Sequence, residues 1–326
     1  MESLTPQAAR NLPLLDDAVR DLVASQIAAR LLTLASPMPE QVGSIAHQTI
    51  AGPDSQLLLR MYTPEGDGPF PVLVFFFGGG FVIGSLEHAD ATARALSNAA
   101  KCIVVTPAYR QAPESKFPAA VEDAVAATQW VMAQAGRFSG DVRRVAVGGA
   151  SAGGNLAAVV SQIARDHGGP VPVHQLLIYP MVHWAFDTPS YEEHALAKPL
   201  SSAKMAWFMR HYLRDEADRS NPKASPLLAQ DLSALPPATI ITAENDPLRD
   251  DGRLYADKLS KAGVPVSYHH YSGVMHGFFG LAGILPKAKD AVQQAAANLR
   301  VAFADPDEDV DLSGPAGAES QPILTI

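Results

Sequence analysis

Short apolar runs separated by helix-length segments dominate the chain from residue 72 onward. Most of these runs are continuously apolar or β-branched, which is typical of strands buried on both faces of a sheet. Strands that alternate with helices form right-handed βαβ units, so the pattern predicts an α/β fold with a largely parallel sheet. The expected strands are Val72–Phe77, Ile103–Thr106, Val145–Val147, Leu176–Tyr179, Ala238–Thr242 and Val266–Tyr271, and helices are expected near 88–100, 119–135, 153–166, 250–262 and 286–302.

Two other patterns precede this alternation. Residues 12–34 repeat apolar side chains at intervals of three and four, which predicts one amphipathic helix. Ile45–Ile50 and Leu57–Tyr62 are predicted to be antiparallel strands, because the first alternates apolar and polar residues as an edge hairpin does.

The segment 181–236 interrupts the rhythm, since it is too long for a single crossover helix and is rich in aromatic residues. Apolar residues inserted over the end of a sheet indicate a lid above a pocket, although a helix packed on the core would carry the same residues. Residues 304–326 contain proline, glycine and six acidic residues, and are predicted to form a disordered tail.

Composition narrows the class of protein. The chain has 326 residues, of which 47% are hydrophobic and 18% charged, as in a globular protein with a large core. The tail carries six of the nine net negative charges, so the remainder is close to neutral. Because no cluster of basic residues marks a nucleic-acid or membrane surface, we expect a small-molecule partner and no nucleic acid.

Cysteine usage and the amino terminus bear on location. Cys102 is the single cysteine, which leaves no internal disulfide or thiolate zinc cluster and is compatible with the cytoplasm. The amino terminus does not resemble a signal peptide, and no apolar run approaches the roughly 18 residues of a membrane span.

Ser151 is the candidate nucleophile. It lies in Gly149-Ala150-Ser151-Ala152-Gly153, between an expected strand and an expected helix, which is the setting of a nucleophile elbow. The sharp turn forces the serine into strained dihedral angles, so the residues two before and two after it must lack a Cβ. An ordinary glycine-rich turn is the alternative, while no dinucleotide-binding fingerprint fits this segment.

A serine on such an elbow is served by an acid and a histidine at the ends of later strands. His269 and His270 fall within the last expected strand, whereas His276 lies in the loop after it, where a base can reach the serine. Asp246 follows the preceding strand and would orient the imidazole of His276.

The choice of acid leaves alternatives. Glu244, Asp250 and Asp251 are close competitors of Asp246. Since Pro247 is suited to the first position of the next helix, Asp246 could also serve only as the helix cap.

A glycine run supplies the candidate oxyanion hole. In Phe77-Gly78-Gly79-Gly80-Phe81, the backbone N–H groups of Gly79 and Gly80 would join that of Ala152 in binding a tetrahedral oxyanion. A flexible or phosphate-binding loop is the alternative, although no lysine follows as it does in a P-loop.

With these motifs, the chain resembles the hormone-sensitive-lipase-like (bacterial family IV) branch of the α/β-hydrolases over roughly residues 40–303. Beyond the elbow and the glycine run, the resemblance rests on Gly80-Phe81-Val82-Ile83-Gly84-Ser85, Tyr109-Arg110-Gln111-Ala112-Pro113-Glu114, Phe117-Pro118-Ala119-Ala120, Gly153-Gly154-Asn155-Leu156-Ala157, Tyr179-Pro180, Asp246-Pro247-Leu248-Arg249-Asp250 and His276-Gly277-Phe278. It implies an α/β-hydrolase fold with a helical cap, and a serine carboxylesterase for short- to medium-chain acyl esters. It also implies the catalytic residues Ser151, Asp246 and His276, and makes a homodimer plausible through the last strand or helix.

Two positions depart from the family pattern. Phe77 stands where the family usually has histidine, and Ala150 where it usually has aspartate. Loss of the hydrogen bonds of an imidazole would cost about 1–3 kcal/mol if nothing replaces them. The sequence thus predicts a working enzyme that is slower or unusually selective.

The expected organisation is an N-terminal cap segment at 1–42, a core at 43–180 and 223–303, a cap insertion at 181–222 and the tail. Neither metal nor cofactor is expected. Tyr109, Arg110, Glu114 and Asp123 are interpreted as scaffold, a buried or half-buried ion pair and turn near the site. The predicted pocket wall consists of Phe81, Val82, Trp207, Phe208 and Phe278. The alternatives are a ligand-binding or catalytically impaired homologue, an amidase or lyase using the same pocket, and an interfacial lipase.

Overall fold

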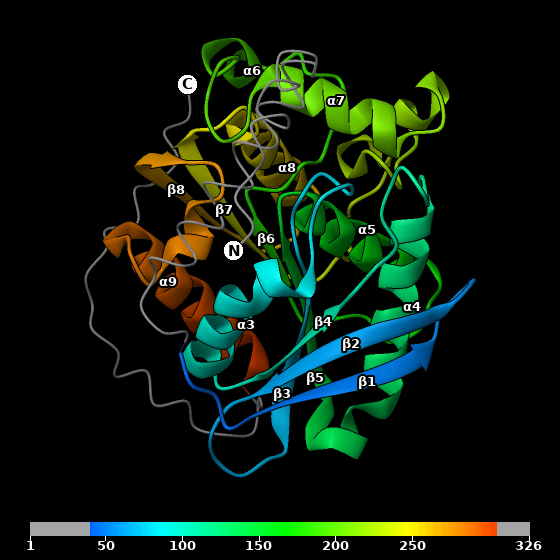
Figure 1. Ribbon diagram of the computed structural model, residues 1–326, viewed down its shortest axis with the longest axis vertical. Helices are drawn as coiled ribbons and strands as arrows, with labels where there is room; N and C mark the ends of the chain where they lie inside the picture. Colours follow the sequence, from blue (N-terminus) through cyan, green and yellow to red (C-terminus); the bar gives the residue numbers. More distant parts are fainter. Residues whose placement is uncertain (1–39, 305–326) are drawn as a thin grey trace, which may run out of the picture.

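A computed structural model describes residues 40–304 and shows one sheet of eight strands in the order β1-β2-β4-β3-β5-β6-β7-β8 (Figure 1). β1 pairs antiparallel with β2, and β2 antiparallel with β4, while the remaining pairs are parallel. The strands are β1 (Ser44–Ala51), β2 (Gln56–Thr63), β3 (Phe70–Phe76), β4 (Ile103–Pro107), β5 (Gly140–Ala150), β6 (Gln175–Ile178), β7 (Ala238–Asn245) and β8 (Val266–Met275).

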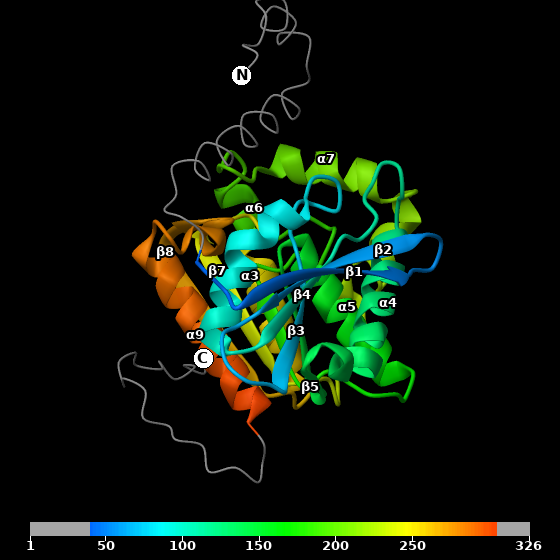
Figure 2. The same cartoon turned by 60° about the horizontal axis from the view of Figure 1, so that its bottom comes forward.

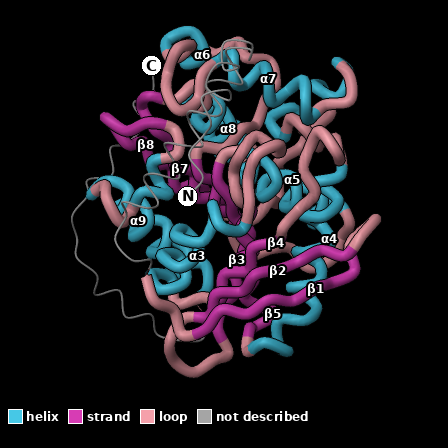
Figure 3. The backbone as a smooth tube through the Cα atoms, in the orientation of Figure 1, coloured by secondary structure: helices cyan, strands magenta, loops and turns pink. Residues whose placement is uncertain are grey.

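Helices cover both faces of this sheet (Figure 3). α3 (Leu86–Ala100) packs against α9 (Pro286–Phe303) on one face. On the other, α4 (Ala119–Gln134) packs against α5 (Ala152–Asp166), and Gln162 of α5 donates a 3.1 Å hydrogen bond to the hydroxyl of Tyr255 in α8 (Arg249–Lys261). A short 3₁₀ helix, η2 (Ala135–Phe138), follows α4.

The position of β3, covered by helices on both faces of the sheet, explains why its sequence is continuously apolar. Val72, Val74 and Phe76 belong to the core beneath α4, α5 and α8, whereas Leu73 and Phe75 belong to the core beneath α3 and α9. Alternate side chains of a strand point to opposite faces, so a strand covered on both sides needs apolar residues at every position. The expected parallel sheet, antiparallel hairpin and flanking helices are therefore confirmed, while the expected helix at 12–34 lies outside the described residues.

The insertion after β6 lies over the carboxyl end of the sheet (Figure 2). Helix α7 (Ser202–Tyr212) begins where the Ser201 hydroxyl accepts the backbone N–H of Lys204, a side-chain cap of its amino terminus. Phe208 of this helix lies against the glycine run. The elements of the insertion are α6 (Pro189–Glu193), α7 (Ser202–Tyr212), η3 (Glu216–Ser220) and η4 (Pro226–Leu228), and η5 (Phe278–Leu281) follows β8.

Two predictions about the ends of the chain stay untested, because the N-terminal cap segment and the acidic tail fall almost wholly outside residues 40–304. Within that range, no helix combines the length and the apolarity needed to cross a bilayer.

Candidate active site

Ser151 stands at the sharp turn between β5 and α5, with φ 57° and ψ −117°. A Cβ on Gly153 would overlap the carbonyl oxygen of Phe76, and one on Gly149 would overlap the backbone of Gly153. The backbone N–H of Ser151 donates a 2.9 Å hydrogen bond to the carbonyl of Ile178 in β6, which helps hold the strained residue. The glycine spacing is thus a steric requirement of the turn.

Asp246, His276 and Ser151 form a continuous hydrogen-bonded chain. His276 Nε2 lies 3.1 Å from Ser151 Oγ, and its Nδ1 lies 2.7 Å from Asp246 Oδ2. The Asp246 carboxylate is fully buried, and the side chain of His276 is 12% exposed. The other oxygen of Asp246, Oδ1, accepts the backbone N–H of Leu248 at 2.9 Å. The Asp246 carboxylate therefore both caps its own loop and orients the imidazole of His276.

The competing acids and histidines have other partners. Glu244 binds the backbone N–H of Gly273, and Asp250 accepts the backbone N–H of Ser190 at 3.0 Å. His269 pairs with Ser267, and His270 pairs with Thr242.

Asp251 is a buried carboxyl close behind this chain of groups. Burial, aided by the negative charge of Asp246, raises the pKa of Asp251 well above its usual value, although the backbone N–H groups of Val182 and His183 bind it. These bonds join α8 to the first residues of the insertion.

The glycine run turns beside Ser151 in a backbone conformation that residues with a side chain rarely adopt. Gly79 has φ 123° and Gly80 φ 61°, and the Gly79 carbonyl accepts the N–H groups of Val82 and Ile83 at 3.1 and 2.9 Å. A Cβ on Gly78 would lie 3.3 Å from Ser151 Cβ, which shows how closely the loop approaches. Among residues 40–304, the N–H groups of Gly79 and Gly80 donate to no backbone carbonyl, so they remain available to a bound oxyanion.

Phe77, at the start of this run, is buried against Tyr109. Their rings stack with centroids 4.3 Å apart and an interplanar angle of 19°. The Tyr109 hydroxyl donates a 2.8 Å hydrogen bond to the Phe77 carbonyl. The next residue, Arg110, binds Asp123 at 2.9 Å, so the predicted scaffold ion pair is present, whereas Glu114 is exposed.

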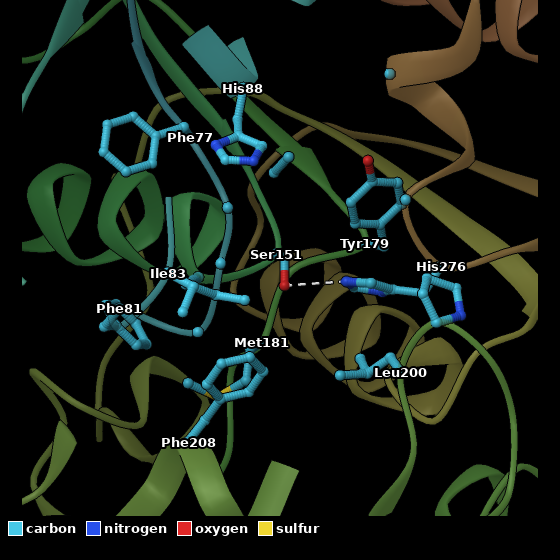
Figure 4. A pocket seen from close by; sticks show the side chains of 18 of the residues that line it. Phe77, Phe81, Ile83, His88, Ser151, Tyr179, Met181, Leu200, Phe208 and His276 are labelled. Carbon is cyan, nitrogen blue, oxygen red and sulfur yellow. Dashed lines mark hydrogen bonds between the residues drawn. The ribbon is translucent and has the colours of Figure 1, made fainter. Parts of the chain in front are cut away.

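A cavity of about 290 Å³ opens beside Ser151 and is lined mostly by apolar side chains (Figure 4). Phe81 and Phe208 line it as predicted, but Val82, Trp207 and Phe278 do not. Phe278 is buried between Tyr179 and Tyr271, while its neighbour Phe279 reaches the cavity. The lining residues missed from the sequence include His88, Thr92, Tyr179, Met181, Trp184, Leu200, Met205 and Phe279.

Comparison with known proteins gives a consistent answer. Residues 73–280 match a family model described as an alpha/beta hydrolase fold. The chain is 45% identical over 257 residues to esterase LipI of Mycobacterium tuberculosis, covering 77% of this chain and 80% of that protein. It is 38% identical over 249 residues to an arylesterase of Saccharolobus solfataricus, covering 76% and 81%.

The solved structures agree. The crystal structure of EstE1, a thermostable carboxylesterase cloned from a metagenomic library, matches with a TM-score of 0.84 and 39% identity, covering 89% of this chain and all of that one. An esterase from Pyrobaculum calidifontis matches with a TM-score of 0.83 and 39% identity, and the match covers 93% of this chain and all of that one. This chain therefore belongs to the α/β-hydrolase superfamily, in its hormone-sensitive-lipase-like branch.

Proposed function

We propose that this protein is a serine carboxylesterase that hydrolyses short- to medium-chain acyl esters through an acyl-enzyme. The observation that carries the proposal is the 3.1 Å approach of His276 Nε2 to Ser151 Oγ, beside a glycine run with available N–H donors. The relatives named esterase and carboxylesterase support the same class of reaction.

In this mechanism, Ser151 attacks the ester carbonyl while His276 removes its hydroxyl proton. Asp246 holds the imidazole in one tautomer and stabilises its protonated form. The N–H groups of Gly79, Gly80 and Ala152 bind the developing oxyanion, a contact worth about 3–4 kcal/mol per donor. His276 then protonates the departing alcohol, and water repeats the sequence on the acyl-enzyme.

Hydrolysis of p-nitrophenyl esters from acetate to palmitate tests the proposal, with Ser151→Ala measured beside the intact chain. We expect activity to peak at short or medium acyl lengths and to vanish in the variant. Ser161→Ala is a matched control, because that hydroxyl is buried in α5 and, within the described part of the chain, bonds only to the Ala157 carbonyl at 2.9 Å.

Two further readouts separate the alternatives. An organophosphate should label Ser151 stoichiometrically, and the products should include a free carboxylic acid, which a lyase does not release. An intact chain as inactive as Ser151→Ala would contradict hydrolysis and favour a ligand-binding homologue.

A cytoplasmic location and a homodimer stay predictions from the sequence. Gel filtration of the purified chain measures the second.

A further inference from the structure

Four polar side chains line the cavity without a part in the proposed mechanism or a bond to a nearby carbonyl. Ser151 and His276 belong to that mechanism, and the Lys204 ammonium donates to the Pro199 carbonyl at 3.1 Å. The polar side chains that remain are His88, Thr92, Tyr179 and Trp184, and among residues 40–304 the buried indole N–H of Trp184 has no hydrogen-bond partner.

His88 and Thr92 lie one helical turn apart on α3 and so face the same way. A Cβ on Gly280 would lie 3.7 Å from the Thr92 hydroxyl, so this hydroxyl faces η5 across space that the glycine leaves open. Figure 4 shows the imidazole of His88 between Phe77 and Tyr179, on the side of Ser151 away from Phe208. We call this side of the cavity, lined by His88, Thr92 and Tyr179, the α3 side.

The His88 ring is oriented by a neighbour. His88 is exposed at the mouth of the cavity, its Nδ1 lies 3.1 Å from the Ser85 hydroxyl, and within residues 40–304 its Nε2 has no hydrogen-bond partner. A neutral imidazole offers either a donor or an acceptor at that nitrogen, depending on the tautomer, and a threonine hydroxyl offers both. The α3 side therefore suits a ligand group that both donates and accepts.

The opposite side of the cavity is different in kind. It is lined by Met181, Leu200 and Phe208, which offer carbon and sulfur atoms. The Lys204 ammonium there is bonded to the Pro199 carbonyl. The Trp184 indole N–H, beside Phe81, is buried, so neither group depends on water that an alkyl chain would displace. An alkyl chain fits there without loss, whereas on the α3 side it would take water from polar groups and return no hydrogen bond. The two sides of the cavity thus favour different substituents of an ester, polar ones on the α3 side and alkyl ones on the opposite side.

We propose that the α3 side binds a terminal hydroxyl or primary amide carried by one portion of the ester, so that the preferred substrates are ω-hydroxy or ω-carboxamide esters. The inference rests on the proposed function of the same site. One neutral hydrogen bond corresponds to about a 3- to 10-fold preference in kcat/KM over the isosteric alkyl ester.

Two pairs of isosteric esters test it, and together they identify which portion enters the α3 side. The acyl pair is p-nitrophenyl 6-hydroxyhexanoate against p-nitrophenyl heptanoate. The alcohol pair is 4-hydroxybutyl acetate against pentyl acetate, followed by pH-stat titration. The readout is the ratio of kcat/KM for the polar ester to that for the alkyl ester.

We expect a ratio of about 3–10 in one pair, and a fall towards 1 in both His88→Leu and Thr92→Val. His167→Leu is the matched control, because that imidazole is exposed at the end of α5 and should leave the ratio unchanged. A ratio at or below 1 in both pairs would overturn the inference, as would a preference that both variants keep.

Failure of the proposed function has a different signature. The Ser151→Ala variant is titrated calorimetrically with the intact esters of both pairs. Tighter binding of a hydroxy ester, with no turnover by the intact chain, would reject hydrolysis and uphold recognition by the α3 side. Equal binding within both pairs would reject that recognition.

Discussion

The Tyr109 hydroxyl donates a 2.8 Å hydrogen bond to the backbone carbonyl of Phe77 while the two rings stack. Farther along the loop, the Gln111 side chain donates to the Gly84 carbonyl at 3.0 Å, and the Ala112 N–H donates to the Phe81 carbonyl at 2.9 Å. These contacts anchor the glycine run on both sides. Phe77 therefore contributes by stacking, where the family's usual histidine would contribute by hydrogen bonding.

Tyr109→Phe isolates the hydroxyl from the stack. The buried Phe77 carbonyl loses its partner, so we expect unfolding free energy to fall by about 1–3 kcal/mol and kcat to fall by about 3- to 10-fold as the loop loosens. Urea unfolding and p-nitrophenyl butyrate kinetics measure the two effects. Unchanged kcat despite lower stability would show that the hydroxyl supports the fold without shaping the loop.

Phe77→His introduces a polar ring into an apolar site between Tyr109 and Gly84. An imidazole buried there without a partner costs about 1–3 kcal/mol, so we expect lower stability and altered kcat/KM. Thermal unfolding and the p-nitrophenyl ester series test this. A higher kcat/KM than that of the native chain would mean that Phe77 supports the loop poorly. Identical kcat/KM values on every ester would contradict the prediction that Phe77 makes the enzyme slower or more selective.

Gly80→Ala directs a methyl group into the ring of Phe208. We expect the displaced glycine run to lower kcat/KM by about 100-fold or more, comparable to loss of an oxyanion donor. Adding Phe208→Ala should restore part of the activity, because the obstacle is a side chain and not the backbone.

Gly168→Ala is the control for this pair. Gly168 has φ 64°, close to the 61° of Gly80, but a Cβ there would meet nothing within 4 Å. It carries the same backbone strain without the clash, so its kcat/KM should match that of the native chain. A similar loss of activity in both alanine variants would assign the effect to strain.

Asp246→Asn keeps the shape of the acid but not its charge. The amide stabilises neither the required tautomer of His276 nor its protonated form, so we expect kcat to fall by a factor on the order of 10³–10⁴. Asp218→Asn removes another buried carboxylate, paired with Arg214 in the insertion at 2.7 Å, and should lower stability with little effect on kcat. A comparable loss of kcat in both variants would argue against a specific role for Asp246.

His174 should make the fold sensitive to acid. Burial lowers the pKa of His174 to about 4 from an ordinary 6.5. Between these two pH values, the imidazole is protonated in the unfolded chain and neutral in the folded chain. Stability should therefore fall as pH drops from about 6.5 to 4, by up to about 3 kcal/mol from this residue.

His174→Phe should flatten that part of the profile in urea unfolding at several pH values. The Thr239 hydroxyl, which pairs with His174 at 2.9 Å, keeps a second partner in Asn298 at 3.0 Å. His167→Phe, at an exposed position, should leave the slope unchanged. An equal pH slope in the native chain and His174→Phe would contradict the assignment.

The sequence by itself determined the parts of this protein that obey local rules. β3 must be apolar at every position because it is covered on both faces, and the glycines around Ser151 are required by a turn that excludes Cβ atoms. The order of Ser151, Asp246 and His276 along the chain follows the order of the strands that carry them, so this arrangement was predictable before any distance was known.

Tertiary structure alone decided which side chains reach the cavity. Phe278 and Phe279 are neighbours of the same type, yet only Phe279 lines the cavity. Consecutive side chains point in different directions, and the local sequence does not indicate which of those directions leads to the cavity. His88 was missed for the same reason, since its approach depends on the rotation of α3 against β4 and α9. The support of Phe77 by Tyr109 joins residues 32 positions apart, and such contacts arise only when separate strands are packed side by side.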